Sequence, residues 1–168
     1  MNKKLLFFLL IPFLGVSQIQ IGQDIDGEAP GDLSGYGLSL SLNGKILAIG
    51  ALENDGNGSD SGHVRVHENI SGTWTQIGQD IDGEASGDRS GNSVSLSSNG
   101  EIVAIGAYLN DGNGSDSGHV RVYKNISGVW TQIGQDINGE SANDRSGFSV
   151  SLSSDGTIVA VGAPFNDA

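Results

Sequence analysis

A six-residue sequence occurs three times in the chain: Gln20-Ile21-Gly22-Gln23-Asp24-Ile25, Gln76-Ile77-Gly78-Gln79-Asp80-Ile81 and Gln132-Ile133-Gly134-Gln135-Asp136-Ile137. The copies lie 56 residues apart, and residues 34–89 align with residues 90–145 without a gap and with 41 identical positions. A fixed period of this length marks a structural unit that buries its apolar face only by stacking on copies of itself. The function is therefore expected to belong to an array of units rather than to one catalytic pocket.

The N-terminus has the features of an export signal. Lys3 and Lys4 supply positive charge, residues 5–16 form a short apolar segment, and residues 15–17 are a small-residue cleavage site. We expect residues 1–17 to be a signal peptide and the mature protein to be secreted or held at the cell surface. The apolar segment is short for a membrane span of roughly 20 residues, which makes an uncleaved anchor the less favoured alternative. No membrane span is expected after removal of the signal.

The composition restricts the partners. The chain of 168 residues has a formal net charge of −12, and loss of Lys3 and Lys4 with the signal brings this to about −14. Such an acidic balance disfavours nucleic acid and anionic lipid, because both are polyanions. It favours cations, or a glycan or protein ligand on the cell exterior. The chain has no cysteine, so no disulfide can contribute to its stability.

Within one unit the sequence predicts four strands and no helix. Residues 93–97 alternate serine with apolar side chains, and residues 102–106 are a continuous apolar run, as in a strand buried on both faces. Asn99-Gly100 between them predicts a hairpin with a type I′ turn. The third and fourth strands are expected at residues 119–123 and 129–133.

Four antiparallel strands repeated radially predict an all-β fold made of β-propeller blades, with a solenoid of stacked hairpins as the alternative. The expected organisation is a clasp strand (residues 19–25) and linker within residues 18–33, then one blade each in residues 34–89 and 90–145, and a truncated third blade in residues 146–168. We therefore expect an incomplete propeller of about two and a half blades. This would be the N-terminal fragment of a longer array, whose further blades are its partners.

The sequence also resembles a known repeat family. Residues 146–150 (Ser-Gly-Phe-Ser-Val) and 158–164 (Ile-Val-Ala-Val-Gly-Ala-Pro) are similar to the FG-GAP repeat of integrin α-subunit propellers, and Tyr36-Gly37 stands at the Phe-Gly position of the first copy. The three copies in register resemble the FG-GAP-like repeats of bacterial secreted surface proteins, over all residues after the signal. The resemblance implies a propeller, usually of seven blades, that serves in adhesion or ligand binding.

Integrin-type repeats carry a calcium loop between the FG and GAP strands. The corresponding segments, residues 97–101 and 153–157, are too short to supply the six to eight oxygens that calcium requires, so this site is not expected here. Two other loops place oxygen side chains at alternate positions and are candidate calcium loops: Asp55, Asn57 and Ser59, and their copies Asp111, Asn113 and Ser115. A solvated turn is the favoured alternative for both. The acidic segment with Asp80 and Asp82 is a further, weaker candidate.

Other polar and aromatic side chains are interpreted as structural. His63 and His119 are repeat equivalents without recurring partners at ligand spacing, so packing at a strand edge is expected. Trp74 and Trp130 are expected to be buried between blades, with a sugar-stacking surface as the alternative. Two sequence pairs are expected to form ion pairs between blades: Asp88-Arg89 and Asp144-Arg145.

The repeat, the export signal and the absence of a distinctive catalytic set predict an extracellular, non-enzymatic scaffold or adhesion module. No catalytic residue and no cofactor other than calcium is predicted. The alternative is the propeller portion of a secreted hydrolase whose active residues lie outside this chain, because a fold does not fix a function.

Overall fold

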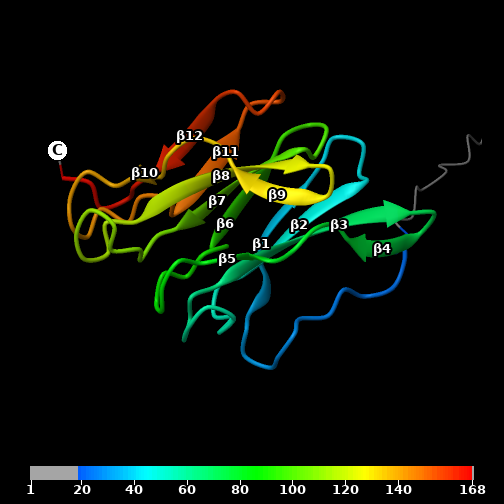
Figure 1. Cartoon of the computed structure of the whole chain (residues 1–168), viewed down its shortest axis with the longest axis horizontal. Coiled ribbons are helices and arrows are strands. Elements are labelled where there is room, and N and C mark those ends of the chain that lie inside the picture. Colours follow the sequence, from blue (N-terminus) through cyan, green and yellow to red (C-terminus); the bar gives the residue numbers. More distant parts are fainter. Residues whose placement is uncertain (1–18, 168) are drawn as a thin grey trace, which may run out of the picture.

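The computed structural model describes residues 19–167, so the predicted signal peptide lies outside the described residues. The described part of the chain consists of twelve strands joined by turns and loops, and the fold is all-β as predicted (Figure 1). Nothing in this range forms a helix that could serve as a membrane span.

The strands form three antiparallel sheets, which we call blades 1, 2 and 3. Blade 1 contains β1 (Ser34–Leu40), β2 (Ile46–Ala51), β3 (His63–Ile70), β4 (Thr73–Gln76) and β5 (Ile81–Asp82). Blade 2 contains β6 (Ser93–Leu96), β7 (Ile102–Ala107), β8 (His119–Ile126), β9 (Val129–Gln132) and β10 (Ile137–Asn138). Blade 3 contains β11 (Ser149–Leu152) and β12 (Val159–Gly162). The four-strand antiparallel unit expected from the sequence is thus confirmed, and it is the unit of a β-propeller.

The fourth strand of each complete blade is broken into two pieces. In blade 1, β4 pairs with the second half of β3, and β5 pairs with the start of the same strand, where Val64 lies opposite Ile81. Residues 77–80 lie between these two pieces and belong to neither strand, although the Ile77 N–H still donates to the Val66 carbonyl (2.8 Å). Blade 2 repeats the arrangement with β9 and β10 on β8. The break brings Asp80 close to His63, the first residue of β3.

The blades stack through their first strands. β1 packs against β6 and β6 packs against β11, so blade 2 lies between blades 1 and 3 (Figure 1). The hydroxyl of Ser39 accepts a hydrogen bond from the backbone N–H of Leu96 (2.9 Å), and Ser95 does the same for Leu152 (2.9 Å). The same contact at the same repeat position shows that the two junctions share one geometry.

The apolar core fills the space between blades 1 and 2. It contains Ala48, Val64, Val66 and Ile81 from blade 1, and Val94, Leu96, Val103, Ile105, Tyr123 and Trp130 from blade 2. Strand β7 is buried on both faces, as its continuous apolar run predicts, because Val103 and Ala104 point to opposite faces and both are fully buried. Each such valine stabilises the stack by about 1.5–3 kcal/mol relative to an exposed position.

The predicted type I′ turn is wrong. That turn needs a positive φ at both central residues, whereas in the structure only the glycine has one: φ is 75° at Gly100, and Asn99 is not in the left-handed region. The N–H of Gly100 bonds to the Ser97 carbonyl (2.9 Å), while Asn99 Oδ1 accepts from the Ser97 hydroxyl (2.8 Å) and the Glu101 N–H (3.1 Å). The hydrogen bonds close a turn over residues 97–100, in which Gly100 alone has a positive φ.

Residues 19–25, expected to be a clasp strand, form no strand in the structure. Their repeat equivalents in blade 1 pair with β3, where Gln76 lies opposite His67. Within the described residues, residues 19–25 have no such partner, and an extended segment becomes a strand only when its N–H and C=O groups pair in a ladder. They are instead held by Trp74, whose indole Nε1 donates to the Ile21 carbonyl (3.1 Å).

The expected ion pairs of Asp88 with Arg89 and of Asp144 with Arg145 do not form among the described residues. Asp88 is buried and accepts from the side-chain amide of Asn110 (3.0 Å), whereas Arg89 joins the blades by pairing with Glu53 (3.3 Å) and donating to the Tyr108 hydroxyl (3.4 Å). The same carboxylate–amide bond recurs between Asp32 and Asn54 and between Asp144 and Asn166. Adjacent residues point in different directions here, so the acid and the base find different partners.

Asp155 stands where the first two units have asparagine, and we predict an abnormally acidic carboxyl group there. Its Oδ1 accepts from the Ser153 hydroxyl (2.6 Å), the Thr157 N–H (3.0 Å) and the Thr157 hydroxyl (2.8 Å). The Ser153 hydrogen bond, followed by those of Thr157, lowers the pKa of Asp155 to about 2 from an ordinary 3.8. The bonds favour the ionised form, so their contribution is present above pH 4 and is lost as the pH falls toward 2.

An NMR titration of the Asp155 carboxyl carbon measures this directly, and we expect a midpoint near 2 in the full chain. Ser153→Ala should raise the midpoint because it removes the largest contribution to the shift. A wild-type midpoint close to the ordinary value of 3.8 would contradict the hydrogen-bonded turn.

Candidate functional site

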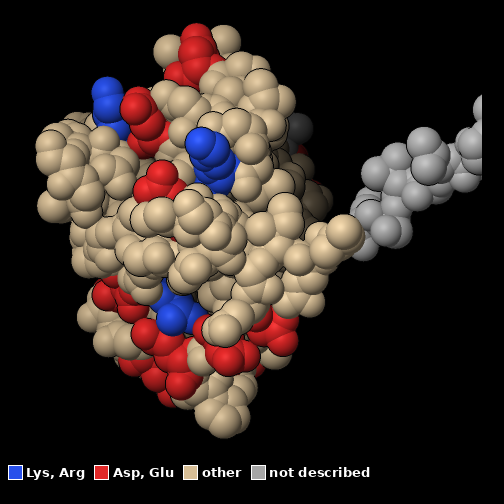
Figure 2. All heavy atoms as spheres, turned by 90° about the vertical axis from the view of Figure 1, so that its right-hand side faces the viewer, with Lys and Arg blue, Asp and Glu red and all other residues tan. Residues whose placement is uncertain are grey.

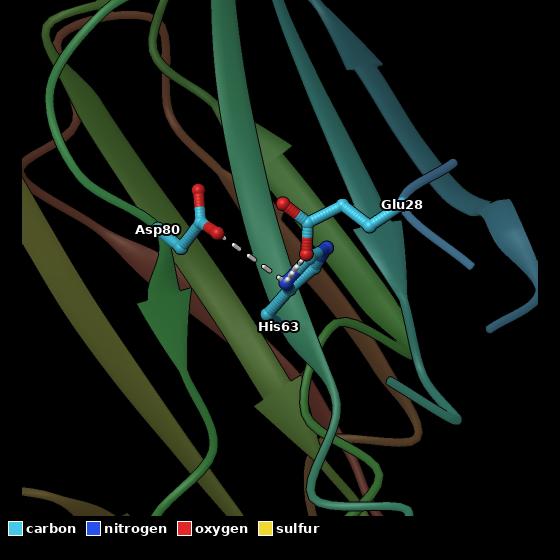
Figure 3. Close-up of side chains that lie close together, drawn as sticks. All are labelled: Glu28, His63 and Asp80. Carbon is cyan, nitrogen blue, oxygen red and sulfur yellow. Dashed lines mark ion pairs between the residues drawn. The ribbon is translucent and has the colours of Figure 1, made fainter. Parts of the chain in front are cut away.

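Three side chains that are far apart in the sequence meet at the start of β3. His63 is the first residue of that strand and is 2% exposed. Glu28 comes from this linker, and Asp80 comes from the break between β4 and β5. Figure 3 shows both carboxylates directed at the imidazole from opposite sides.

The distances in this first cluster are short and nearly equal. His63 Nδ1 lies 3.8 Å from Glu28 Oε2 and 3.8 Å from Asp80 Oδ2. The three ligand-type atoms all lie within 4.8 Å of one another. These separations are too long for hydrogen bonds, which end at about 3.2 Å for a nitrogen donor and an oxygen acceptor. The carboxylates therefore surround the ring nitrogen without bonding to it.

Blade 2 contains the same cluster, with every member 56 residues further along: Glu84, His119 and Asp136. His119 is the first residue of β8 and is 1% exposed, and its Nδ1 lies 3.7 Å from Glu84 Oε2. We call the two sets the first and second histidine–carboxylate clusters. Both place a buried imidazole under two partly exposed acids.

The imidazole of the second cluster has a lowered pKa and lacks a hydrogen bond at one nitrogen. Burial, followed by the charge of Arg121, lowers the pKa of His119 below its ordinary value of 6.5. Its Nδ1 is buried and has no hydrogen-bond partner among the residues that the structure describes. A buried polar atom in this state costs about 1–3 kcal/mol, so its retention needs an explanation.

An arginine on the same strand as each histidine holds the glutamate in place. In the first cluster Arg65 Nη1 lies 3.6 Å from Glu28 Oε1, and its Nη2 donates to the Asp26 carbonyl (2.9 Å). In the second, Arg121 makes the same two contacts with Glu84 (3.5 Å) and Asp82 (2.7 Å). One oxygen of each glutamate is thus held by arginine while the other faces the histidine.

The sequence interpretation of these histidines was wrong in one respect. His63 and His119 are buried at strand edges as expected, but partners do converge on them. The carboxylate partners of His63 were not predicted because Glu28 is 35 residues before it and Asp80 is 17 residues after it, so no local spacing connects the three residues. The available signal was the recurrence of all three residue types one repeat later, which is hard to recognise where most positions recur.

The side chains of the predicted calcium loops take part in loop hydrogen bonds. Asp55 Oδ1 accepts from the Asp60 N–H (2.9 Å), and the Asn57 amide donates to the Gly83 (2.8 Å) and Glu84 (3.1 Å) carbonyls. The copy does the same through Asp111 and Asn113. Calcium binding by these loops, with Ser59 and Ser115, stays a prediction. What the contacts do show is that the loop fixes the linker that carries Glu84.

The calcium site of integrin-type repeats does not fit this chain. The corresponding connection between β6 and β7 has five residues, and its side-chain oxygens at Ser97 and Asn99 are already bonded within the turn. It cannot also provide six to eight ligands for calcium.

The two tryptophans, although repeat equivalents, differ in exposure. Trp130 is 3% exposed in the core between blades 1 and 2, whereas Trp74 is half-buried. Trp74 lines a hollow of about 490 Å³ together with His67, Gln76 and residues 23–26. Blade 1 therefore has an accessible aromatic ring at the position where blade 2 has a core residue.

The fold and the repeated clusters define a class of protein, an all-β repeat protein built of stacked propeller-type blades. Residues 80–123, from the break in blade 1 to the middle of β8, match the FG-GAP repeat family, and this segment of the chain is an FG-GAP repeat. The expected family resemblance is thereby confirmed. A comparison with curated proteins finds no match.

Proposed function

We propose that this chain acts outside the cell as a non-enzymatic ligand-binding or adhesion module. The observation that carries the proposal is the half-buried Trp74 in its polar hollow, within a stack of FG-GAP-type blades. Its volume of about 490 Å³ lies in the range of small-molecule pockets, which is about 300–1,000 Å³. An indole beside amide and carboxylate side chains can stack on the apolar face of a sugar ring while the polar groups bond its hydroxyls.

The charge of the molecule supports a neutral or basic ligand. The net charge is −12, and Figure 2 shows acidic side chains gathered toward the lower end of one face with few basic ones among them. A surface of this kind repels polyanions and attracts cationic or uncharged partners. Glycans and basic protein surfaces are therefore the first ligands to test.

The test is binding of the full chain to immobilised glycan and protein panels, with Trp74→Ala compared with a matched control. Tyr36→Ala removes another accessible aromatic ring, 61% exposed on β1, outside the hollow. We expect Tyr36→Ala to bind like the wild type and Trp74→Ala to bind about 5- to 150-fold more weakly, because a stacked aromatic ring is worth about 1–3 kcal/mol. Thermal unfolding of both variants confirms that they remain folded.

The proposal would be contradicted if the wild-type chain bound no ligand on either panel, or if Trp74→Ala bound as tightly as the wild type. Hydrolysis of a glycan or peptide ligand by the purified chain would favour the alternative of an enzyme. For the alternative in which the active residues lie outside this chain, the discriminating observation is a catalytic domain in adjoining sequence.

A further inference from the structure

The two histidine–carboxylate clusters have the composition of a metal site rather than of an ion pair. Each joins one imidazole nitrogen and two carboxylate oxygens within 4.8 Å of one another. Two ionised carboxylates carry a charge of −2, which a divalent cation neutralises. A simple ion pair would bring a carboxylate within hydrogen-bonding distance of the imidazole, whereas the closest carboxylate oxygen lies 3.7 Å from His119 Nδ1 and 3.8 Å from His63 Nδ1.

In the second cluster, the unpartnered Nδ1 of His119 is a second, independent observation. This nitrogen belongs to a side chain that is 1% exposed and faces Glu84, 3.7 Å away, yet forms no hydrogen bond with any described residue. A lone pair in this position is satisfied by a metal ion placed between the imidazole and the carboxylates. The same ion would account for the convergence of two acids on one nitrogen, while the other oxygen of the aspartate accepts from Gln76 or Gln132 (2.6 Å) and that of the glutamate pairs with arginine.

We propose that each cluster binds one divalent transition-metal ion, with Zn²⁺ the best fit. The ligands would be Nδ1 of the histidine, Oε2 of the glutamate and a carboxylate oxygen of the aspartate: Glu28, His63 and Asp80 in the first cluster, and Glu84, His119 and Asp136 in the second. Three protein ligands leave one position of a tetrahedral ion for water or an external group.

The geometry needs only a small contraction. Ligands at about 2.1 Å from a tetrahedral zinc ion lie about 3.4 Å from one another. The two distances from His63 Nδ1 are both 3.8 Å, so each contracts by a few tenths of an ångström. The two carboxylate oxygens lie within 4.8 Å of each other, so they approach by at most about 1.4 Å. Glu28 and Asp80 are 45% and 30% exposed, so neither carboxylate is packed tightly enough to prevent this movement.

The residue types select the metal. Calcium takes only oxygen ligands, usually six or more, so an imidazole-containing set of three is unsuited to it. Imidazole with carboxylate suits Zn²⁺ and its first-row neighbours. The arginine bound to the other oxygen of each glutamate fixes the orientation of that ligand, which is the usual role of residues around a metal site.

The two repeats differ at positions close to the clusters but not at the cluster residues themselves. His67 is replaced by Tyr123 in blade 2, and Asp82 is replaced by Asn138, although both positions lie close to the clusters in sequence. All six cluster residues are retained. These replacements supply control variants that the fold already accommodates in the other blade.

The proposal does not depend on the ligand-binding function above. It predicts that zinc connects three segments of one blade: the incoming linker, the start of the third strand and the break in the fourth. An ion bound only by the folded chain stabilises it by mass action, so zinc should raise the melting temperature.

The experiment is a zinc titration of the full chain, stripped of metal with a chelator, by calorimetry and by competition with a chromophoric chelator. We expect two equivalents of zinc per chain, one for each cluster. His63→Ala and His119→Ala should each bind one equivalent, and the double variant none. Cobalt(II) added to the wild type should show the visible absorption of nitrogen and oxygen coordination, and the double variant should lack it.

Because both histidines are buried, variants at the partly exposed acids guard against simple misfolding. Glu28→Gln and Glu84→Gln keep the shape of the side chain, and each should weaken zinc binding at one site by about tenfold or more. His67→Tyr and Asp82→Asn are the matched controls, and both should retain two equivalents. Circular dichroism of every variant verifies the fold.

The proposal is overturned if the wild type binds no zinc in excess metal. It is overturned equally if folded Glu28→Gln and Glu84→Gln bind zinc like the wild type, or if zinc uptake is lost in His67→Tyr, because the metal would then bind elsewhere.

Discussion

Gly50→Ala is expected to lower the free energy of unfolding by about 3 kcal/mol, which is at the upper end of the cost of overpacking. A Cβ on Gly50 would overlap the carbonyl oxygen of Gly91 and lie 2.8 Å from its carbonyl carbon. Gly91 lies in the segment that leads into β6 of blade 2, so neither backbone can move without separating the blades. Gly106→Ala should cost a similar amount, because its Cβ meets Gly147 in the same way.

The control is Gly162→Ala, the same repeat position in blade 3. There the Cβ would meet only the hydroxyl of Ser149 closely, and its other neighbours are 3.6 Å away. A serine side chain can rotate, and alanine in a strand restricts the unfolded chain more than glycine does, so the change should lie within about 1 kcal/mol of zero. Denaturant unfolding of the full chain measures all three variants. Equal losses for Gly162→Ala and Gly50→Ala would show that blade contact is not the cause.

This inter-blade contact could not be predicted from the repeat alone. Gly50, Gly106 and Gly162 are identical in the sequence, and each is expected within or at the end of a buried apolar strand. Gly50 and Gly106 differ from Gly162 because the carbonyls of Gly91 and Gly147 are directed at them from the next blade. Both of these glycines have a positive φ. The sequence therefore predicted the strands, but not that the glycines in them allow the backbone of the next blade to approach.

What the sequence did predict depends on local periodicity. Alternation at residues 93–97 and the apolar run at residues 102–106 correspond to β6 and β7, because side-chain direction in a strand depends only on parity. The break between β4 and β5 was not predicted, since Ile77 and Asp80 look like any turn in a polar segment. That break brings Asp80 to His63, so the candidate site was missed with it.

Trp130→Ala is expected to cost about 3–5 kcal/mol, the range for removing a large buried aromatic side chain. The ring is 3% exposed within the core between blades 1 and 2, and its Nε1 donates to the Ile77 carbonyl (2.9 Å). The variant would lose the packing of the ring and leave that carbonyl without its donor. It would also open a cavity at the junction, because the facing strands are fixed by their own ladders.

Trp74→Ala is the matched control for the buried tryptophan. Its indole makes the equivalent hydrogen bond to the Ile21 carbonyl (3.1 Å), but the side chain is half-buried and borders a hollow. Solvent can fill the vacated space there, so the expected loss is about 1–2 kcal/mol. The difference between the two variants, measured by denaturant unfolding, isolates the contribution of burial between blades, since the hydrogen bond and the residue type are the same. Equal losses would mean that the segment held by each indole, rather than the packed junction, determines the stability of the array.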